Sequence, residues 1–526
     1  MIKTDISLPI GYLEADIKNA ICERLPVEKS EIREAHILKR ALDVSDKTLP
    51  YYKATVAVSF SEEREAGLLK MKKKVSPFSE LRLEIPSLKS APSPVVVGSG
   101  PCGLFAALIL AEAGANPIVL ERGLAVEERA AVVDRFNKLG ILDAECNVQF
   151  GEGGAGTYSD GKLKVGSMDK YKMKVLSEFC SAGAPEEILY TVGAHLGTDK
   201  LSDIVRCVRE KIISLGGRFI YGAKMTKIGV NDGAVSSVSY LREGSEHILD
   251  ADSVILAIGH SAKDSFESLL LCGVKMEPRG FGIGVRIEHP REYINELIYG
   301  KNYDERLGSA SYHLVTHLKN GRSVYSFCMC PGGTVVAAAS ESGGVVTNGM
   351  SEYARDAQNS NAAFLVSVTP ADFESEHPLA GMELQRKIER RAFEIGGGDY
   401  KAPALALGDF LENTENKGFP ISPSYPRGVV SASPSLYLPS VVSESLRESI
   451  SDFDAWLPGF NLSDAVMTGA ETRSTSPVRI LRGANYESVS VRGLYPAGEG
   501  AGYSGGIVSS AVDGVRTALA LISNKD

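Results

Sequence analysis

The sequence predicts an α/β protein with a parallel sheet in three layers, interrupted by an inserted α+β domain and preceded by a small α+β module. Two observations support this fold class. The stretch 95–123 is typical of a strand, a glycine-rich turn, a helix and a second strand, which together form one βαβ unit. The order of strand, glycine loop and helix returns at 493–522, about 200 residues later. We therefore expect a discontinuous, Rossmann-like domain with an insertion.

The composition is that of an ordinary globular protein, with 44% hydrophobic and 23% charged residues in 526. The net charge of −9 argues against attraction of the whole molecule to nucleic acid. The N-terminus lacks the apolar core of a secretory signal, and no run of 18 apolar residues occurs, so we expect a cytoplasmic protein without membrane contact. The eight cysteines have neither zinc-site nor disulfide spacing, which predicts reduced thiols and no metal. We interpret the close pair Cys328 and Cys330 as half-buried strand cysteines rather than a redox pair.

The chain divides into consecutive segments with different patterns. Near the N-terminus, apolar residues at a spacing of four over 13–25 predict a helix, and alternation over 54–60 predicts a strand. Prolines over Pro77–Pro94 mark a linker. The basic cluster Lys70–Lys74 is either a solvated helix end or a contact for an anionic partner. The expected segments are an N-terminal α+β module (1–90), the first part of the nucleotide-binding domain (91–266), an inserted substrate or cap domain (267–465) and the C-terminal part of the nucleotide-binding domain (466–526).

The first glycine-rich turn has the pattern of a dinucleotide site. Gly98 permits the tight turn, Gly100 lets the backbone approach a pyrophosphate, and Gly103 lets the helix pack closely on the strand. The N-terminus of the following helix offers free N–H groups and the positive end of its dipole. Glu121 lies 23 residues after Gly98, where a carboxylate can accept hydrogen bonds from ribose hydroxyls. The strand, the helix and the acid all stand where this motif requires them.

A second glycine-rich stretch, NVQFGEGGAGTYSDGKL at 147–163, is too rich in glycine for a helix. Its backbone amides can face a flat, polar-edged ring or a pyrophosphate, because glycines carry no side chain that would hold the ligand away. A glycine-rich surface loop is the alternative interpretation. A third stretch, 251–264, is an apolar strand that ends at Gly259, as expected of a parallel strand that leads to the same crevice.

Three stretches resemble one bacterial family. They are 147–163, ETRSTSPVRILR at 471–482, and GLYPAGEGAGYSGGIVSSAVDG at 493–514. They are similar to the uncharacterised FAD-dependent dehydrogenases, an NAD(P)/FAD-dependent oxidoreductase family of the glutathione-reductase-like FAD superfamily. The resemblance covers essentially the whole chain. It implies FAD as the cofactor and leaves the substrate open. We expect the FAD to be noncovalent, because the flavin-proximal motifs require no His or Cys as a tether, while Cys146 and His260 are the residues close enough in sequence to act as one.

Position by position, the resemblance implies which residues bind the cofactor. Met225 is implied to meet the adenine, and Glu499 to accept a ribityl hydroxyl. The implied pyrophosphate and ribose residues are Gly98, Gly100, Pro101, Cys102, Gly103, Glu121, Arg122 and Gly123. The remaining cofactor-binding residues are Gly153, Gly154, Ala155, Gly156, Thr157, Ser159, Asp160, Lys162, Ala257, Ile258, Gly259, Gly498, Ser504, Gly505, Gly506 and Ile507.

The function that we expect is that of an FAD-dependent oxidoreductase, which transfers hydride or electrons between bound flavin and a small organic substrate. No second glycine motif stands in its own βαβ unit, so NAD(P)H or another electron donor would act without a dedicated domain. One alternative is a flavoprotein that acts on RNA through the basic N-terminal module. A non-catalytic flavin-binding sensor is another.

Three residues are candidates for catalysis. Lys162 ends the second glycine loop, and Arg473 stands just before the chain returns to the nucleotide-binding domain, so we expect both at the domain boundary. Either cation could hold an anionic substrate, whereas Arg473 could equally pair with Glu471 or Asp464. His260 follows the third strand and is a candidate general acid, although a hydrogen-bonded structural histidine is the more common case.

Overall fold

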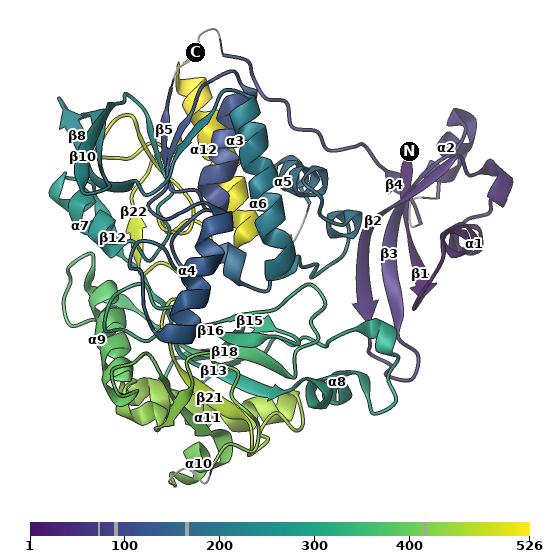
Figure 1. The fold of residues 1–526 in the computed structure, drawn as a ribbon. Helices are drawn as coiled ribbons and strands as arrows, with labels where there is room; N and C mark the ends of the chain where they lie inside the picture. The colour runs from purple at the N-terminus through teal and green to yellow at the C-terminus, as the bar shows by residue number, and fades with distance from the viewer. Residues whose placement is uncertain (72–73, 89–92, 164–167, 415–417, 526) are drawn as a thin grey trace.

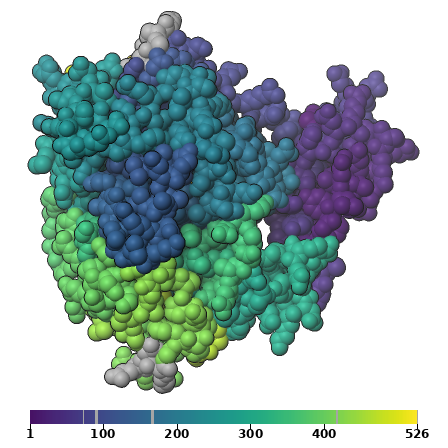
Figure 2. Space-filling view, in the orientation of Figure 1, coloured from purple at the N-terminus to yellow at the C-terminus, as the bar shows by residue number. Residues whose placement is uncertain are grey.

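The computed structural model describes residues 1–71, 74–88, 93–163, 168–414 and 418–525. Two large domains pack against each other, and the N-terminal module stands to one side of them (Figure 1). In the space-filling view this module, coloured purple, forms a separate lobe (Figure 2). No helix in the described part of the chain is both long and apolar enough to span a bilayer.

The N-terminal module is a four-stranded antiparallel sheet with two helices. Its elements are β1 (Ile2–Pro9), α1 (Glu14–Arg24), β2 (Glu34–Asp43), β3 (Tyr51–Ser59), α2 (Glu62–Leu69) and β4 (Ser76–Pro77), with the sheet order β2-β3-β1-β4. Buried and exposed residues alternate strictly along β1, as a sheet with one covered face requires. Within the expected linker, 78–88 contains no helix or strand, and 89–92 lie outside the described residues. Lys72 and Lys73 of the basic cluster also lie outside them.

The first large domain is built on a parallel sheet. Its strands are β5 (Val95–Val97), β6 (Ile118–Leu120), β7 (Arg218–Ile220), β11 (Val254–Leu256) and β23 (Leu494–Pro496), in the order β23-β11-β5-β6-β7. All four pairings are parallel. The three residues of β5 are buried, in agreement with their β-branched run. The C-terminal strand β23 therefore completes a sheet that begins 400 residues earlier, as the strand, glycine loop and helix pattern at 493–522 predicts.

Two layers cover this sheet. One face carries α3 (Pro101–Glu112), α5 (Lys170–Ser181), α6 (Gly197–Ser214) and α12 (Ile507–Lys525), which share one apolar core (Figure 1). The other face packs against α7 (Lys263–Leu271) and the antiparallel meander β8 (Lys224–Asn231), β9 (Ala234–Arg242) and β10 (Ser245–Asp250). A further helix, α4 (Val126–Leu139), leads from the sheet toward the second domain (Figure 1). The domain thus has three layers.

The second large domain is a mixed, mainly antiparallel sheet of seven strands. In spatial order they are β14 (Val315–His317), β15 (Ser323–Cys330), β18 (Asn359–Val368), β13 (Phe281–Pro290), β21 (Val466–Glu471), β19 (Ala402–Ala406) and β20 (Val429–Ser431). The helices of this domain are α8 (Arg291–Tyr299), α9 (Ala380–Ile395), α10 (Leu407–Glu412) and α11 (Ser440–Trp456). A small ribbon of β16 (Thr334–Ala337) with β17 (Thr347–Met350) completes it. A second ribbon, β12 (Met276–Pro278) with β22 (Val478–Ile480), lies between the two large domains, and its buried residues pack into the core of the parallel-sheet domain.

Two elements cross the limits that the sequence suggested for the inserted domain. Helix α7 spans the expected limit at 266/267, and its Phe266 and Leu269 pack into the core of the parallel-sheet domain. Strand β21 follows the expected limit at 465/466, but it pairs with β13 and β19 in the seven-stranded sheet. Both differences arise because a short buried segment has the same apolar pattern whichever core it joins.

Candidate functional site

A cavity lies at the carboxyl edge of the parallel sheet, between the two large domains. Its wall includes the residues that follow β5 and β11, the neighbouring strands at which the strand order reverses. Open α/β sheets bind their ligands at this switch point. The second domain contributes Phe327, Cys328, Asn348 and Glu471 to the opposite wall. The cavity is therefore the candidate functional site.

Most residues that were predicted from the motifs lie in this wall. They are Gly98, Gly100, Pro101, Cys102, Glu121, Arg122, Gly154, Ala155, Gly156, Ser159, Lys162, Met225, Ala257, Ile258, Gly259, Gly498, Glu499, Gly505, Gly506 and Ile507, together with His260 and Arg473. The predicted residues outside the wall are Gly103, Gly123, Gly153, Thr157, Asp160 and Ser504. The chain thus brings motifs together from both ends of the parallel-sheet domain.

The first glycine turn contains both packing glycines and an open one. Gly98 has a φ of +98°, and a Cβ there would lie 2.4 Å from the carbonyl oxygen of Ala257. A Cβ at Gly103 would lie 1.8 Å from the oxygen of Gly98, so Gly103 packs the helix on the strand instead of lining the cavity. A Cβ at Gly100 would meet only the Cα of Gly154, at 3.7 Å. The space beside Gly100 is open, and α3 begins there with N–H groups that have no partner within the helix.

Glu121 holds the turn and the second loop together. Its Oε2 accepts hydrogen bonds from the N–H of Ser99 at 2.9 Å and from the Ser99 hydroxyl at 2.7 Å. Its Oε1 accepts from the N–H groups of Gly123 at 2.9 Å and Gly151 at 3.0 Å. Each carboxylate oxygen offers about two lone pairs, so these four donors fill the carboxylate. A ribose hydroxyl would have to replace one of them, and the Ser99 hydroxyl is the donor that can rotate away.

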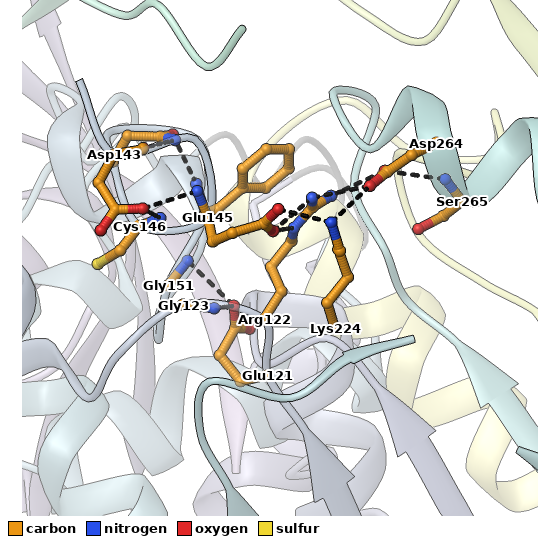
Figure 3. A network of polar contacts seen from close by, with 12 residues as sticks. Glu121, Arg122, Gly123, Asp143, Glu145, Cys146, Gly151, Lys224, Asp264 and Ser265 are labelled. Carbon is orange, nitrogen blue, oxygen red and sulfur yellow. Dashed lines mark hydrogen bonds and ion pairs between the residues drawn. The ribbon is translucent and has the colours of Figure 1, made fainter. Parts of the chain in front are cut away.

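An ion-pair network borders the same end of the cavity (Figure 3). The Arg122 guanidinium donates to Glu145 at 2.6 and 2.8 Å and to Asp264 at 3.0 Å. Lys224 lies 2.7 Å from Glu145 and 3.6 Å from Asp264. The guanidinium of Arg122 also lies over the ring of Phe150, 4.0 Å from its centroid. These contacts fix the side chain of Arg122 in the cavity wall, where the sequence motifs predict it.

Arg129 organises the second glycine loop from beneath. Its side chain is on α4, and its exposed fraction is 0%. The guanidinium donates to five backbone carbonyls of the loop, those of Asn147, Val148, Gly151, Glu152 and Gly154, at 2.7–3.3 Å. Four of the five N–H donors of the arginine thus have acceptors within the loop, because the Nη1 group serves three of the carbonyls. The loop is therefore built around a buried charge, which the glycine pattern of the sequence does not indicate.

The end of this loop contacts the second domain. Asp160 is fully buried and, instead of lining the cavity, it pairs with Arg355 and accepts a hydrogen bond from the Ser351 hydroxyl. Lys162 donates to the backbone carbonyl of Met329 and lies 4.0 Å from Asp160. Burial lowers the pKa of Lys162, against the pull of Asp160. Asp160 and Lys162 thus join the two domains. Lys162 lies in the cavity wall, and its ammonium group already donates a hydrogen bond to Met329.

The other predicted residues outside the wall are held by packing. A Cβ at Gly123 would lie 2.6 Å from the Cα of Gly151, and the N–H of Gly153 donates to Ser99. Thr157, within the second glycine loop, is buried. The Ser504 hydroxyl lies 2.8 Å from the hydroxyl of Ser510.

Cys328 brings a thiol to the cavity at the end of β15. Its backbone has a φ of +40°, and its carbonyl accepts from the guanidinium of Arg286 at 2.7 Å. A hydrogen bond from the Cys330 thiol, together with the charges of Arg286 and Lys162, lowers the pKa of Cys328 against the effect of burial. The structure therefore places an easily ionised thiol in the wall. Cys102 lines the same cavity, but burial raises its pKa well above the ordinary value.

Arg473 has a different partner from those that the sequence suggested. Its guanidinium donates to both carboxylate oxygens of Glu389, at 2.9 and 2.7 Å, and to the hydroxyl of Ser340. Glu471 pairs with Arg286 at 2.8 Å instead. The side chain of Arg473 is 6% exposed, so its charge is committed to Glu389 within the protein.

His260 and Glu499 form a half-buried pair with perturbed pKa values. The Nε2 of His260 lies 4.0 Å from Oε1 of Glu499, and its Nδ1 lies 3.0 Å from the Ser261 hydroxyl. Burial and the charge of Arg473 lower the pKa of His260 to about 4. Burial raises the pKa of Glu499 to about 7, against the attraction of Arg279. Near neutral pH the imidazole is therefore uncharged, and the carboxyl group is close to half protonated.

Sequence reasoning missed part of the wall. The missed residues include Ser99, Gln149, Phe150, Lys224, Ser261, Phe327, Cys328, Asn348, Glu471, Ser474, Ser509 and Ser510. Gln149 and Phe150 stand inside the second loop motif, so that motif could have indicated them. Glu471 and Ser474 likewise stand inside the stretch 471–482 that carries the family resemblance, and Cys328 belongs to the close cysteine pair. Phe327 and Asn348 come from strands of the second domain without a local motif, and no sequence signal marks them. Within the described ranges, no three His, Cys, Asp or Glu side chains gather closely enough to bind a metal ion.

The fold and the site define an α/β protein with a ligand cavity at the carboxyl edge of a parallel sheet. A family model described as "FAD-dependent protein, C-terminal domain-like" matches residues 280–474. A protein of Clostridium beijerinckii, described as an uncharacterized protein, is 45% identical over 518 residues, which cover 97% of this chain and 96% of that protein. The chain therefore belongs to the family of the C. beijerinckii protein, and its residues 280–474 are similar to the C-terminal domain of FAD-dependent proteins.

Similar solved structures include two reductases. An Escherichia coli quinol fumarate reductase is 12% identical, with a TM-score of 0.37 over 83% of this chain and 71% of that chain. A geranylgeranyl bacteriochlorophyll reductase-like protein of Thermoplasma acidophilum is 10% identical, with a TM-score of 0.37 over 83% of this chain and 79% of that chain. These values are too low for either similarity to carry an argument.

Proposed function

We propose that the chain is an oxidoreductase that binds FAD noncovalently in the cavity and acts on a small organic substrate at the end lined by the second domain. The observation that carries this proposal is the open space beside the glycines. A Cβ at Gly505 would meet no atom within 4 Å, and one at Gly100 would meet only a single Cα, and neither residue has a positive φ that would itself require glycine. Protein packing does not account for these glycines, whereas the close approach of a flat ring or a pyrophosphate does.

The residues of the wall fit a long dinucleotide. We place the pyrophosphate at the start of α3, where the first N–H groups and the helix dipole favour a dianion. The adenosine end lies toward Glu121 and Met225, and the flavin end toward Cys328 and Gly505. This order follows the resemblance of the motifs to the glutathione-reductase-like superfamily. Bound FAD supplies the hydride or electron transfer, and the protein supplies orientation and electrostatics.

The chain's own groups can hold one proton at the flavin end. Near neutral pH the Glu499 carboxyl is close to half protonated, since its pKa is raised to about 7, so it can either donate or accept this proton. His260 is neutral there, so it can accept a proton and is not a general acid in its resting state. Lys162 and Arg473 already have partners in Met329 and Glu389, which argues against either as the free cation for a substrate. We therefore keep His260 and Glu499 as candidates for proton transfer.

A substitution at Gly100 tests the proposal. Gly100 has an extended backbone conformation and an unobstructed Cβ direction, so Gly100→Val should fold while its side chain enters the cavity. Protein purified with FAD and precipitated with acid should release all of its flavin into the supernatant, where chromatography distinguishes FAD from FMN. We expect Gly100→Val to carry less than about a tenth of the wild-type flavin, as expected if ~1.4 kcal/mol or more of affinity is lost. Gly67→Ala, on exposed helix α2, is the control. Wild-type protein that neither carries nor binds FAD would contradict the proposal.

An electron-transfer measurement separates an enzyme from a flavin-binding sensor. The bound flavin should be reduced under anaerobic conditions with NADH and NADPH in turn, and its reoxidation followed with quinones and other organic acceptors. We expect at least one donor and one acceptor to exchange electrons in seconds to minutes. A flavin that reacts only with dithionite and oxygen would favour the sensor.

A further inference from the structure

A second hollow opens beside the flavin end of the cavity. Its wall consists of Arg279, Tyr325, Phe327, Ser474, Thr475, Arg479, Gly502, Tyr503, Ser504 and Gly505. Phe327, Ser474 and Gly505 belong to both walls, so the two spaces adjoin. The predicted cofactor residue Ser504 lies in this second hollow rather than in the main cavity.

The two arginines stand on one ribbon between the domains. Arg479 lies in the middle of β22, and Arg279 directly follows β12, the strand that pairs with it. The N–H of Arg279 donates to the carbonyl of Pro477 at 2.8 Å, which fixes its backbone against the crossing strand. The two guanidinium groups therefore face the same hollow from adjacent, hydrogen-bonded segments.

Both guanidinium groups lack a carboxylate partner. Among the described residues, no Asp or Glu lies within 4.0 Å of Arg279 or Arg479, although Glu277 is opposite Arg479 in the ribbon. Arg279 donates to the hydroxyl of Thr475 at 3.3 Å, and Arg479 lies 3.5 Å from the carbonyl of Gly502. The Nε of Arg479 is buried and has no hydrogen-bond partner. Only two of the ten N–H donors of the pair have an acceptor among the residues that the structure describes, and the guanidinium of Arg479 also lies 5.3 Å from the ring centroid of Tyr503.

The electrostatics of the pair favour an anion. Both side chains are half-buried, and burial together with the charge of Arg479 lowers the pKa of Arg279, against the pull of Glu499. Two like charges in a partly desolvated hollow destabilise the empty protein, and a bound oxyanion relieves both the repulsion and the missing hydrogen bonds. The forked donors of arginine match the oxygens of a carboxylate or a phosphate.

We propose that Arg279 and Arg479 bind the anionic group, a carboxylate or a phosphate, of the molecule that exchanges electrons with the flavin. The hydroxyl group of Thr475 adds a further donor, whereas that of Ser474 already donates to Gly282 and that of Ser504 is bonded to Ser510. Phe327 lines the passage from the anion to the main cavity. This inference rests on the proposed function for the identity of the neighbouring cofactor. It assigns the anion to these two arginines instead of Lys162 and Arg473, whose charges are already paired.

Anion binding to the purified holoprotein tests the assignment. Inorganic phosphate, succinate, NADH and NADPH should each be titrated by calorimetry in a chloride-free buffer, with flavin content measured on the same sample. We expect one class of anion to bind and Arg479→Gln or Arg279→Gln to weaken it about 10- to 100-fold, as expected for a lost charged hydrogen-bonding partner. Succinate binding would indicate a carboxylate substrate, and preference for NADPH over NADH would indicate a phosphorylated donor. Arg492→Gln, an exposed arginine in neither wall, should bind as the wild type does.

A second measurement guards against a purely structural role. If the two arginines form an anion site, either Gln variant should have a higher melting temperature than the wild type when no anion is added. Added anion should then raise the melting temperature of the wild type and leave that of the variant unchanged. A structural pair would instead lose stability on substitution. The inference is overturned if no anion binds to a flavin-loaded wild type, or if both Gln variants bind as tightly as the wild type. Loss of flavin from the wild type itself would instead count against the proposed function.

Discussion

The buried Arg129 offers a quantitative test of how the glycine loop is held. Replacement by lysine keeps the charge but reduces five N–H donors to three, so at least two of the five loop carbonyls lose their partner. Each buried carbonyl without a partner costs about 1–3 kcal/mol, which gives about 2–6 kcal/mol for the variant. If FAD binding must restore the loop, this cost appears as an affinity that is roughly 30-fold to 10⁴-fold weaker.

The assay is a titration of cofactor-free protein with FAD, followed by the change in flavin fluorescence. Arg135→Lys is the matched control, because Arg135 stands on the same helix and is exposed. Circular dichroism shows whether the Arg129→Lys domain still folds. If this variant folds and binds FAD within about threefold of the wild type, the loop does not depend on the buried guanidinium, and the reasoning is refuted.

Three further predictions concern the turn and the flavin end. Because burial raises the pKa of Glu499 to about 7 from 4.5, the folded protein holds this proton more tightly than the unfolded chain, and its contribution to stability is lost as pH rises from 4.5 to 7. The unfolding free energy of Glu499→Gln should therefore rise relative to that of the wild type by up to about 3 kcal/mol across this interval. Denaturation of both cofactor-free proteins at pH 5 and pH 7 measures this change. A difference in unfolding free energy between the two proteins that is the same at both pH values would contradict it. Cys328 should react with iodoacetamide below pH 8, since its pKa is lowered, while Cys102 stays unmodified; mass spectrometry of the peptides decides, and equal labelling would contradict it. Gly103→Ala should lose at least several kcal/mol of stability, because its Cβ would lie 1.8 Å from the oxygen of Gly98; a soluble variant with wild-type melting would be the contrary result.

The parts of the site that the sequence could indicate are those in which function is carried by consecutive residues. The turn at Gly98 and the loop before Lys162 have glycines at positions where backbone geometry or ligand access requires them. The pattern can therefore be recognised from the sequence alone. The same holds for β5 and β23, whose short apolar runs end at glycines. Local chemistry and local sequence coincide in these segments.

The parts that could not be predicted depend on contacts between distant segments. Arg473 was a candidate to hold the substrate or to pair with Glu471 or Asp464, but its partner Glu389 is 84 residues away on α9. Arg129 has the sequence context of an ordinary charged helix, and only the tertiary fold buries it. The pair of Arg279 and Arg479 arises because β12 and β22 meet across 200 residues of inserted chain. A single charged residue carries no local sign of its partner.

The strand order of the parallel sheet also affects how the protein is synthesised. Strand β11 is complete at residue 256, but its neighbour β23 begins only at residue 494. At about 5–20 residues per second, a ribosome needs roughly 12 to 48 s to make the intervening chain. During that time the edge of β11 has no partner strand, and such an edge can pair with other chains. The growing polypeptide should therefore depend on chaperones or on early docking of the inserted domain, and the cofactor should join only after release from the ribosome.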